Sequence, residues 1–201
     1  ISVAAHKKVA RHYDVPIVDV GEALAKEIAE GTMTWDKDYG GTHPNDKGYE
    51  FATQWIIQVI EDTISGETPQ MVPVPDLLDS GSFARVEWID PQEVNWLGGW
   101  KWGPVSDTLL PKGQIREDYL KYEALRSDEA GNYLYYTFSG NSLGAFVLAG
   151  PDAGRFEVSI NGEEWRSVEL YHRYSKTLNY PRSVLLAEDL GNRFHTAAIR
   201  V

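Results

Sequence analysis

The first 65 residues follow helical and strand-like patterns in turn. Residues 2–13 carry apolar side chains at helical spacing, and residues 16–20 form a short β-branched run typical of a buried parallel strand. Residues 21–30 predict a second helix ending at Gly31. After the loop of residues 32–44, a third helix is expected, with a buried stripe at Phe51, Ala52, Trp55, Ile56, Val59 and Ile60.

This pattern predicts the C-terminal end of a doubly wound α/β domain. One strand and three helices cannot bury both faces of a parallel sheet, so we expect the remaining strands to come from elsewhere. Residues 1–66 are therefore interpreted as the last strand and helices of such a domain. Residues 67–80 are rich in proline and show no helical period, which predicts a linker.

Residues 81–201 change to short alternating runs, which are typical of β-strands. The turn sequences Asn161-Gly162 and Gly150-Pro151-Asp152-Ala153-Gly154 separate some of these runs. Because no helical pattern intervenes, we predict an antiparallel β-sandwich of the jelly-roll type. The expected strands cover residues 84–89, 133–138, 144–148, 155–160, 167–171, 183–186 and 196–201.

Composition excludes several classes of function. The chain has 30 acidic and 19 basic residues, a formal net charge of -11, which opposes binding to a nucleic acid backbone. No apolar run approaches the roughly 20 residues that span a bilayer. The absence of cysteine excludes disulfides, thiol nucleophiles and cysteine metal sites. Histidines and carboxylates do not cluster at metal-ligand spacing, so neither a catalytic metal nor a cofactor is expected.

One histidine stands out as a candidate catalytic residue. His43 precedes Pro44 and the third expected helix, on a loop that follows the predicted strand. Loops in this position carry the reactive groups of doubly wound sheets. An imidazole has a pKa near neutrality and can act as a general base. The alternative interpretation is a surface histidine with no catalytic role.

The sequence around this histidine resembles a known family. His43-Pro44-Asn45-Asp46-Lys47-Gly48-Tyr49 is similar to the last sequence block of SGNH, or GDSL-type, esterases, and Val15-Pro16-Ile17-Val18-Asp19-Val20 resembles the strand before that block. The resemblance covers about the first 65 residues. It implies a serine carboxylic-ester hydrolase in which His43 takes the proton from a serine nucleophile.

In that family the serine and the oxyanion-hole residues precede this block. The 201 residues contain no Gly-Asp-Ser motif. We therefore expect the chain alone to be inactive and to partner the missing N-terminal part of the catalytic domain. The family also places an Asp three residues before the His, where this chain has Gly40. Asp38 is the candidate for orienting the His43 ring. Alternatively, another acid or a backbone carbonyl orients the ring, and Asp38 is only a solvated loop residue.

The sandwich resembles, more weakly, the jelly-roll and galactose-binding-like modules that accompany carbohydrate-active enzymes. Its loop contains three of the seven tryptophans, Trp96, Trp100 and Trp102. Indoles stack on sugar rings, so Trp100 and Trp102 are candidate substrate-binding residues; alternatively they seal the sandwich or pack on the α/β part. The expected function is O-deacetylation of a carbohydrate. One alternative is hydrolysis of another small ester. The other is a non-catalytic carbohydrate-binding or domain-organising module.

Overall fold

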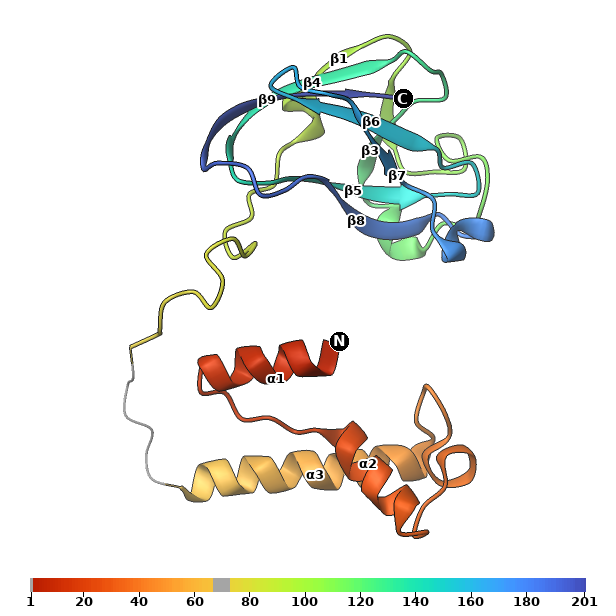
Figure 1. The fold of residues 1–201 in the computed structure, drawn as a ribbon. Helices are drawn as coiled ribbons and strands as arrows, with labels where there is room; N and C mark the ends of the chain where they lie inside the picture. The colour runs from red at the N-terminus through yellow and green to blue at the C-terminus, as the bar shows by residue number, and fades with distance from the viewer. Residues whose placement is uncertain (1, 67–72) are drawn as a thin grey trace. The chain divides into compact units, whose positions relative to one another are not determined.

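The computed structural model describes residues 2–66 and 73–201, and the chain divides into two compact units, Ile1–Ser82 and Phe83–Val201. The first unit is helical and the second consists mainly of β-strands (Figure 1). Part of the predicted linker, residues 67–72, lies outside the described residues. Within the described ranges, no helix is both long enough and apolar enough to cross a membrane.

In its described residues, the helical unit contains three α-helices and one π-helical turn. Asp19 caps the second helix by accepting a hydrogen bond from the Glu22 backbone N–H at 2.9 Å. Lys7 joins the first two helices because its ammonium group lies 2.6 Å from Asp19 and 2.8 Å from Glu22. The elements are α1 (Ser2–His12), α2 (Val20–Ala29), η1 (Trp35–Tyr39) and α3 (Asp46–Ser65).

The predicted strand at residues 16–20 does not form. Residues 15–19 connect the first two helices without regular structure, and Val20 already opens α2. Among the described residues no strand pairs with this segment. A β-strand needs the hydrogen-bonding groups of a neighbouring strand, so a β-branched sequence without such a neighbour stays unpaired.

The apolar stripe of α3 is less buried than expected. Phe51, Trp55 and Val59 are half-buried. Ile56 and Ile60, which the helical period places on the same stripe, are 45% and 50% exposed. The helix therefore presents an apolar face that the rest of its own unit leaves largely uncovered.

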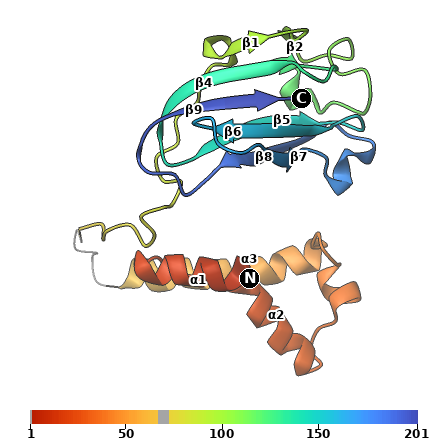
Figure 2. The same ribbon diagram turned by 45° about the horizontal axis from the view of Figure 1, so that its top comes forward.

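The second unit is a set of antiparallel sheets (Figure 2). Five strands form one sheet in the order β1-β4-β9-β6-β7, while β5 pairs with β8 and β2 pairs with β3. The strands are β1 (Asn95–Leu97), β2 (Lys101–Pro104), β3 (Glu123–Arg126), β4 (Tyr133–Gly140), β5 (Leu143–Ala149), β6 (Arg155–Ile160), β7 (Arg166–Glu169), β8 (Tyr180–Ala187) and β9 (Arg193–Arg200).

The core lies between the five-stranded sheet and the β5-β8 pair. Strand β4 shows the alternation that builds it: Phe138 is buried in the core and Leu134 and Tyr136 pack against it, while Tyr135 and Thr137 point outward. The buried cluster combines side chains of both sheets and their connections: Phe138, Leu143, Val158, Ile160, Val184, Leu186, Ala187, Ala197 and Ile199.

Six of the seven predicted strands are found. Four predicted ranges lie within the bounds of β4, β5, β6 and β8 or equal them, and the ranges predicted for β7 and β9 are shifted along the chain. The predicted strand at residues 84–89 is wrong: this segment is irregular, and its Trp88 is 81% exposed. The predicted turn at Asn161-Gly162 is confirmed. Both residues have positive φ, 55° and 78°, and the Glu163 N–H donates to the Ile160 carbonyl at 2.9 Å.

Sequence patterning missed β1, β2 and β3. They have three to four residues each, too few for a recognisable alternation. Pairing with partners far along the chain defines them, since β1 joins β4 and β2 joins β3.

Candidate functional site

His43 lies in a short loop, residues 40–44, whose two ends are tied together. The Asn45 N–H donates to the Tyr39 carbonyl at 2.8 Å. The Asn45 side chain then caps α3 by accepting from the Gly48 N–H at 2.9 Å and donates to the Lys37 carbonyl at 3.3 Å. The loop is therefore closed at its base by the π-helical turn on one side and the start of α3 on the other.

Two glycines make this closure possible. Gly40 adopts φ 99°, and a Cβ atom there would lie 2.7 Å from the Asn45 nitrogen. Gly48 is buried in the first turn of α3, where a Cβ atom would collide with the Tyr39 carbonyl oxygen and crowd Pro44. Glycine at positions 40 and 48 therefore has a structural reason, because a Cβ atom at either position would block this close approach.

The loop presents His43 at the surface. Its side chain is exposed, whereas Pro44 beside it is half-buried. Among the described residues no hydrogen bond to the His43 ring is found. The imidazole can thus accept a proton from a group that approaches from outside this unit.

The structure surrounds Asp38 with donors other than His43. One carboxylate oxygen accepts from the Thr34 N–H at 2.7 Å and from the Thr34 hydroxyl at 2.9 Å, while the other lies 2.5 Å from the Lys47 ammonium group. The Lys47 contact and then the Thr34 hydrogen bonds lower the pKa of Asp38 to about 2. Asp38 is therefore ionised at neutral pH and connects η1 to the first turn of α3, and no hydrogen bond to His43 is found in the described ranges.

The candidate tryptophans of the sandwich are half-buried. The Trp100 indole N–H donates to the Tyr133 carbonyl at 3.2 Å. Trp102, on β2, stacks on Trp96 of β1 with ring centroids 6.3 Å apart and planes 25° apart. Each indole therefore packs against the sandwich on one side while part of its surface reaches solvent.

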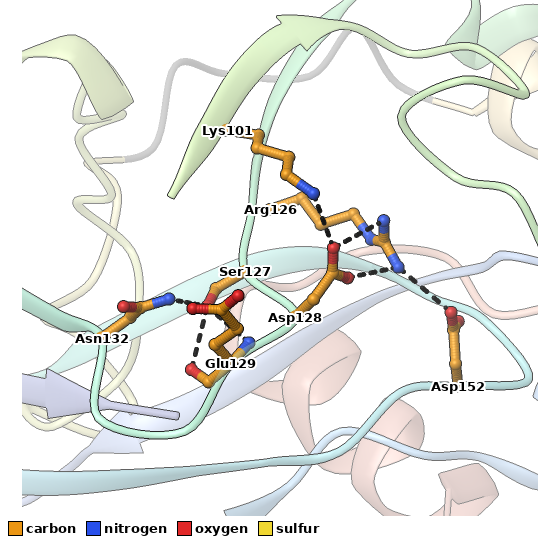
Figure 3. Close-up of polar contacts among 7 residues, drawn as sticks. All are labelled: Lys101, Arg126, Ser127, Asp128, Glu129, Asn132 and Asp152. Carbon is orange, nitrogen blue, oxygen red and sulfur yellow. Dashed lines mark hydrogen bonds and ion pairs between the residues drawn. The ribbon is translucent and has the colours of Figure 1, made fainter. Parts of the chain in front are cut away.

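A network of charges that the sequence analysis missed includes Lys101, which stands between Trp100 and Trp102 in the sequence (Figure 3). Asp128 lies between the Lys101 ammonium group, at 2.9 Å, and the Arg126 guanidinium group, at 2.5 Å, and Arg126 also reaches Asp152 at 3.2 Å. The hydrogen bond from Lys101 and the charge of Arg126 lower the pKa of Asp128. The network links β2, β3 and the turn after β5.

A buried asparagine holds the turn that precedes Trp100. Asn132 is 5% exposed, accepts from the Gly99 N–H at 2.8 Å and donates to the Ser127 hydroxyl at 2.7 Å (Figure 3). Gly98 has φ 98°, and a Cβ atom there would overlap the Asn132 side chain. The Gly-Gly pair before Trp100 could have indicated a tight turn, but its partner lies 33 residues away and has no sequence signal.

Within residues 2–66 and 73–201, no group of three or more histidine and acidic side chains could hold a metal ion. His195, the histidine of β9, shows a purely structural environment. It is 3% exposed, and its two ring nitrogens contact the Gly191 carbonyl at 2.7 Å and the Asn161 amide at 3.0 Å. Both nitrogens are thus engaged inside the sandwich.

Comparison with known proteins finds a similarity of fold. No protein-family model and no curated protein matches the sequence. Similar solved structures include a two-domain esterase (CEX) active on acetylated mannans, with a TM-score of 0.71 and 14% identity. Another is the same kind of esterase co-crystallised with mannopentaose, with a TM-score of 0.66 and 16% identity.

Both similarities extend over 97% of this chain, and the chain covers 53% and 52% of those structures. The chain therefore spans about half the length of the esterases it matches, and it matches them across both of its units. The predicted fold class, a small α/β part followed by an antiparallel β-sandwich, is confirmed through this similarity, although the strand expected at residues 16–20 is not formed in the structure.

Proposed function

We propose that this chain is the C-terminal part of a serine esterase of the SGNH/GDSL type that removes acetyl groups from a carbohydrate. The observation that carries the proposal is the fold similarity to an esterase active on acetylated mannans, which runs through both units. The histidine-containing loop adds the chemistry, because it supplies a base at the place where the resemblance to SGNH esterases puts one.

In the proposed mechanism His43 acts as the general base. It takes the proton from a serine hydroxyl of the N-terminal part, and the serine oxygen attacks the acetyl carbonyl carbon. The imidazolium then gives the proton to the departing sugar oxygen. In the second half His43 activates a water molecule, which releases acetate and regenerates the serine. The closed base of the loop fixes the backbone that carries His43, which supports the positioning that catalysis requires.

Asp38 enters this proposal as a positioning residue. Its bonds to Thr34 and Lys47 fasten η1 to α3 at the foot of the loop. It would fix the loop while another acid or a backbone carbonyl orients the His43 ring.

The exposed apolar surface of the helical unit supports the proposed N-terminal partner. Ile57 and Ile64 of α3 are 46% and 78% exposed, and Val3 and Val9 of α1 are 56% and 46% exposed. Apolar surface of this kind is typical of a face that another part of a domain covers. We propose that the rest of the α/β domain, with its serine and oxyanion hole, packs here.

The sandwich would act as a carbohydrate-binding module of the jelly-roll, galactose-binding-like type, with Trp100 and Trp102 contacting acetylated carbohydrate. A second candidate function, a non-catalytic carbohydrate-binding or domain-organising module, is favoured by the closed core of the sandwich, which the helical unit does not complete. Ester hydrolysis by the complete gene product distinguishes the esterase from the non-catalytic module.

The test compares the complete gene product with its His43→Ala variant, and acetate release from acetylated mannan is measured. We expect His43→Ala to lower kcat by roughly a thousandfold or more, because loss of the base removes activation of the serine. His6→Ala changes another exposed histidine, on α1, and serves as the matched control with unchanged kcat. Full activity of His43→Ala would overturn the proposal.

A second test of the proposed function uses the 201-residue chain by itself. Without a serine nucleophile and oxyanion donors it should hydrolyse p-nitrophenyl acetate only at the background rate of exposed histidines. Saturable turnover that disappears in His43→Ala would contradict the proposed division of the site between this chain and an N-terminal part.

A further inference from the structure

The outer face of the five-stranded sheet carries an ordered row of side chains. In the register, Leu97 of β1 pairs with Tyr133 of β4, Tyr133 pairs with Arg200 of β9, and Arg200 pairs with Glu157 of β6. Paired residues of antiparallel strands point to the same side of a sheet. These four side chains therefore form one line across four strands, on the face away from the core.

Two further pairs lie two and four residues along β4 from Tyr133, beside a shallow groove. Tyr135 pairs with Asn95, and Thr137 pairs with Thr196. All four line a groove of about 140 Å³ at the point where the short strand β1 begins, together with Tyr136 and Ala197. The two threonine hydroxyl groups and the Asn95 amide in this lining can both donate and accept hydrogen bonds.

Aromatic rings extend from the groove along the first line. The rings of Tyr135 and Tyr133 are nearly parallel, 7° apart, with centroids separated by 5.8 Å. Trp165, which precedes β7, meets Tyr133 edge to face at 6.3 Å. Tyr135 and Trp165 remain 40% and 38% exposed. The three rings, called the aromatic platform below, form one contiguous cluster in which Trp165 is turned 70° from Tyr133, and Tyr135 and Trp165 keep exposed surface.

The charges on this face cancel one another. The Arg200 guanidinium group lies 2.6 Å from the Glu157 carboxylate and also covers the Trp165 ring at 4.3 Å from its centroid. The chain as a whole is strongly acidic, with a net charge of -11. An anionic ligand would find no unpaired cation in this pair and would be repelled by the acidic chain. The face fits an uncharged ligand with many hydroxyl groups.

We infer that this outer sheet face, the groove together with Tyr135, Tyr133 and Trp165, binds a neutral extended oligosaccharide. Sugar rings would lie with their apolar C–H faces on the aromatic platform, while their hydroxyls bond the threonines and Asn95 in the groove. The inference concerns a surface other than the Trp100–Trp102 turn. It does not rest on the proposed esterase activity.

The test titrates mannopentaose and cellopentaose into the 201-residue chain by isothermal calorimetry. Tyr135→Ala and Trp165→Ala should each weaken binding roughly tenfold, because each removes a stacking ring. Thr137→Lys should also abolish or strongly weaken binding, since it fills the groove and leaves the platform intact. Thermal melting verifies that each variant is folded. A charged oligogalacturonate of the same length should bind more weakly than either neutral ligand.

Two controls locate the effect on this face. Trp88→Ala removes an indole that is 81% exposed and lies outside β1, β4, β9 and β6, so it should leave affinity unchanged. Trp100→Ala alters the turn that the proposed function assigns to carbohydrate. If Trp100→Ala abolishes binding while Tyr135→Ala and Trp165→Ala do not, the sheet-face site is overturned. If neither pentasaccharide binds the chain, the sheet-face site is overturned as well. The proposed esterase activity is tested separately, by acetate release from the complete gene product.

Discussion

The helical unit and the sandwich hold their structures by different means. In the sandwich, strands distant in sequence bury a shared apolar cluster that includes Val158 and Leu186, 1% and 2% exposed. The buried apolar side chains of the helical unit are Ala23, Leu24 and Met33 among the described residues. Its helices are held by caps and by the ion pairs that join Lys7 of α1 to Asp19 and Glu22. Regular secondary structure is thus not evidence that a unit has a core of its own.

The largest expected effect contrasts side chains from the two units. Phe138→Ala should destabilise the sandwich by about 3–5 kcal/mol, because the ring is 7% exposed in the core and its removal leaves a cavity. Ile64→Ala in α3 should change stability by less than about 0.5 kcal/mol, since this side chain is 78% exposed. Urea unfolding followed by circular dichroism measures both. Equal losses would mean that the units share one core.

Hydrogen exchange sharpens the comparison at the backbone. In a dilute monomer, amides of β4, β6 and β9 should exchange through global unfolding of the sandwich, while those of residues 17–20 should exchange roughly a hundredfold faster or more. The reason is that residues 15–19 lack ladder partners among the described strands. Protection of residues 17–20 equal to that of β9 would contradict this expectation.

A smaller effect is expected at the base of the histidine loop. Gly48→Ala should destabilise the helical unit by about 1–3 kcal/mol, because the added methyl group would collide with the Tyr39 carbonyl oxygen. Gly66→Ala, at the end of α3, is the matched control, since its Cβ atom would lie 3.5 Å from the nearest atoms. Thermal melting of the helical signal measures both variants. An increase in melting temperature for Gly48→Ala would show that the loop is free to move away.

The smallest effect concerns acid stability. The folded-state pKa of Asp38, about 2, lies below its ordinary value of 3.8, so its contribution is complete above about pH 4 and is lost as the pH falls toward 2. Lys47→Gln removes the main cause, and carboxyl resonances followed by NMR should show the pKa of Asp38 rising toward its ordinary value. Asp36→Asn changes a neighbouring acid as a control. An unchanged Asp38 pKa in Lys47→Gln would refute the ion pair.

Part of the candidate site could be predicted from the sequence. The loop that carries His43 before a helix is a local sequence feature, and α3 does begin at Asp46, with Asn45 as its cap. The catalytic role of His43 stays a prediction. The partners of Asp38 were missed. Lys47 stands nine residues later, and nothing in the spacing indicates that the start of α3 returns to η1.

The sequence by itself determined the elements whose signals are local. The spacing of apolar residues identified the three helices, alternation identified β4, β5, β6 and β8, and the Asn161-Gly162 pair identified a turn. Tertiary structure decided the pairing of β1 with β4, the charge network of Asp128, the unpaired state of residues 15–19 and the row of side chains on the outer sheet face. Each of these depends on groups far apart in the chain, whose meeting is set by strand pairing and burial rather than by neighbouring residues.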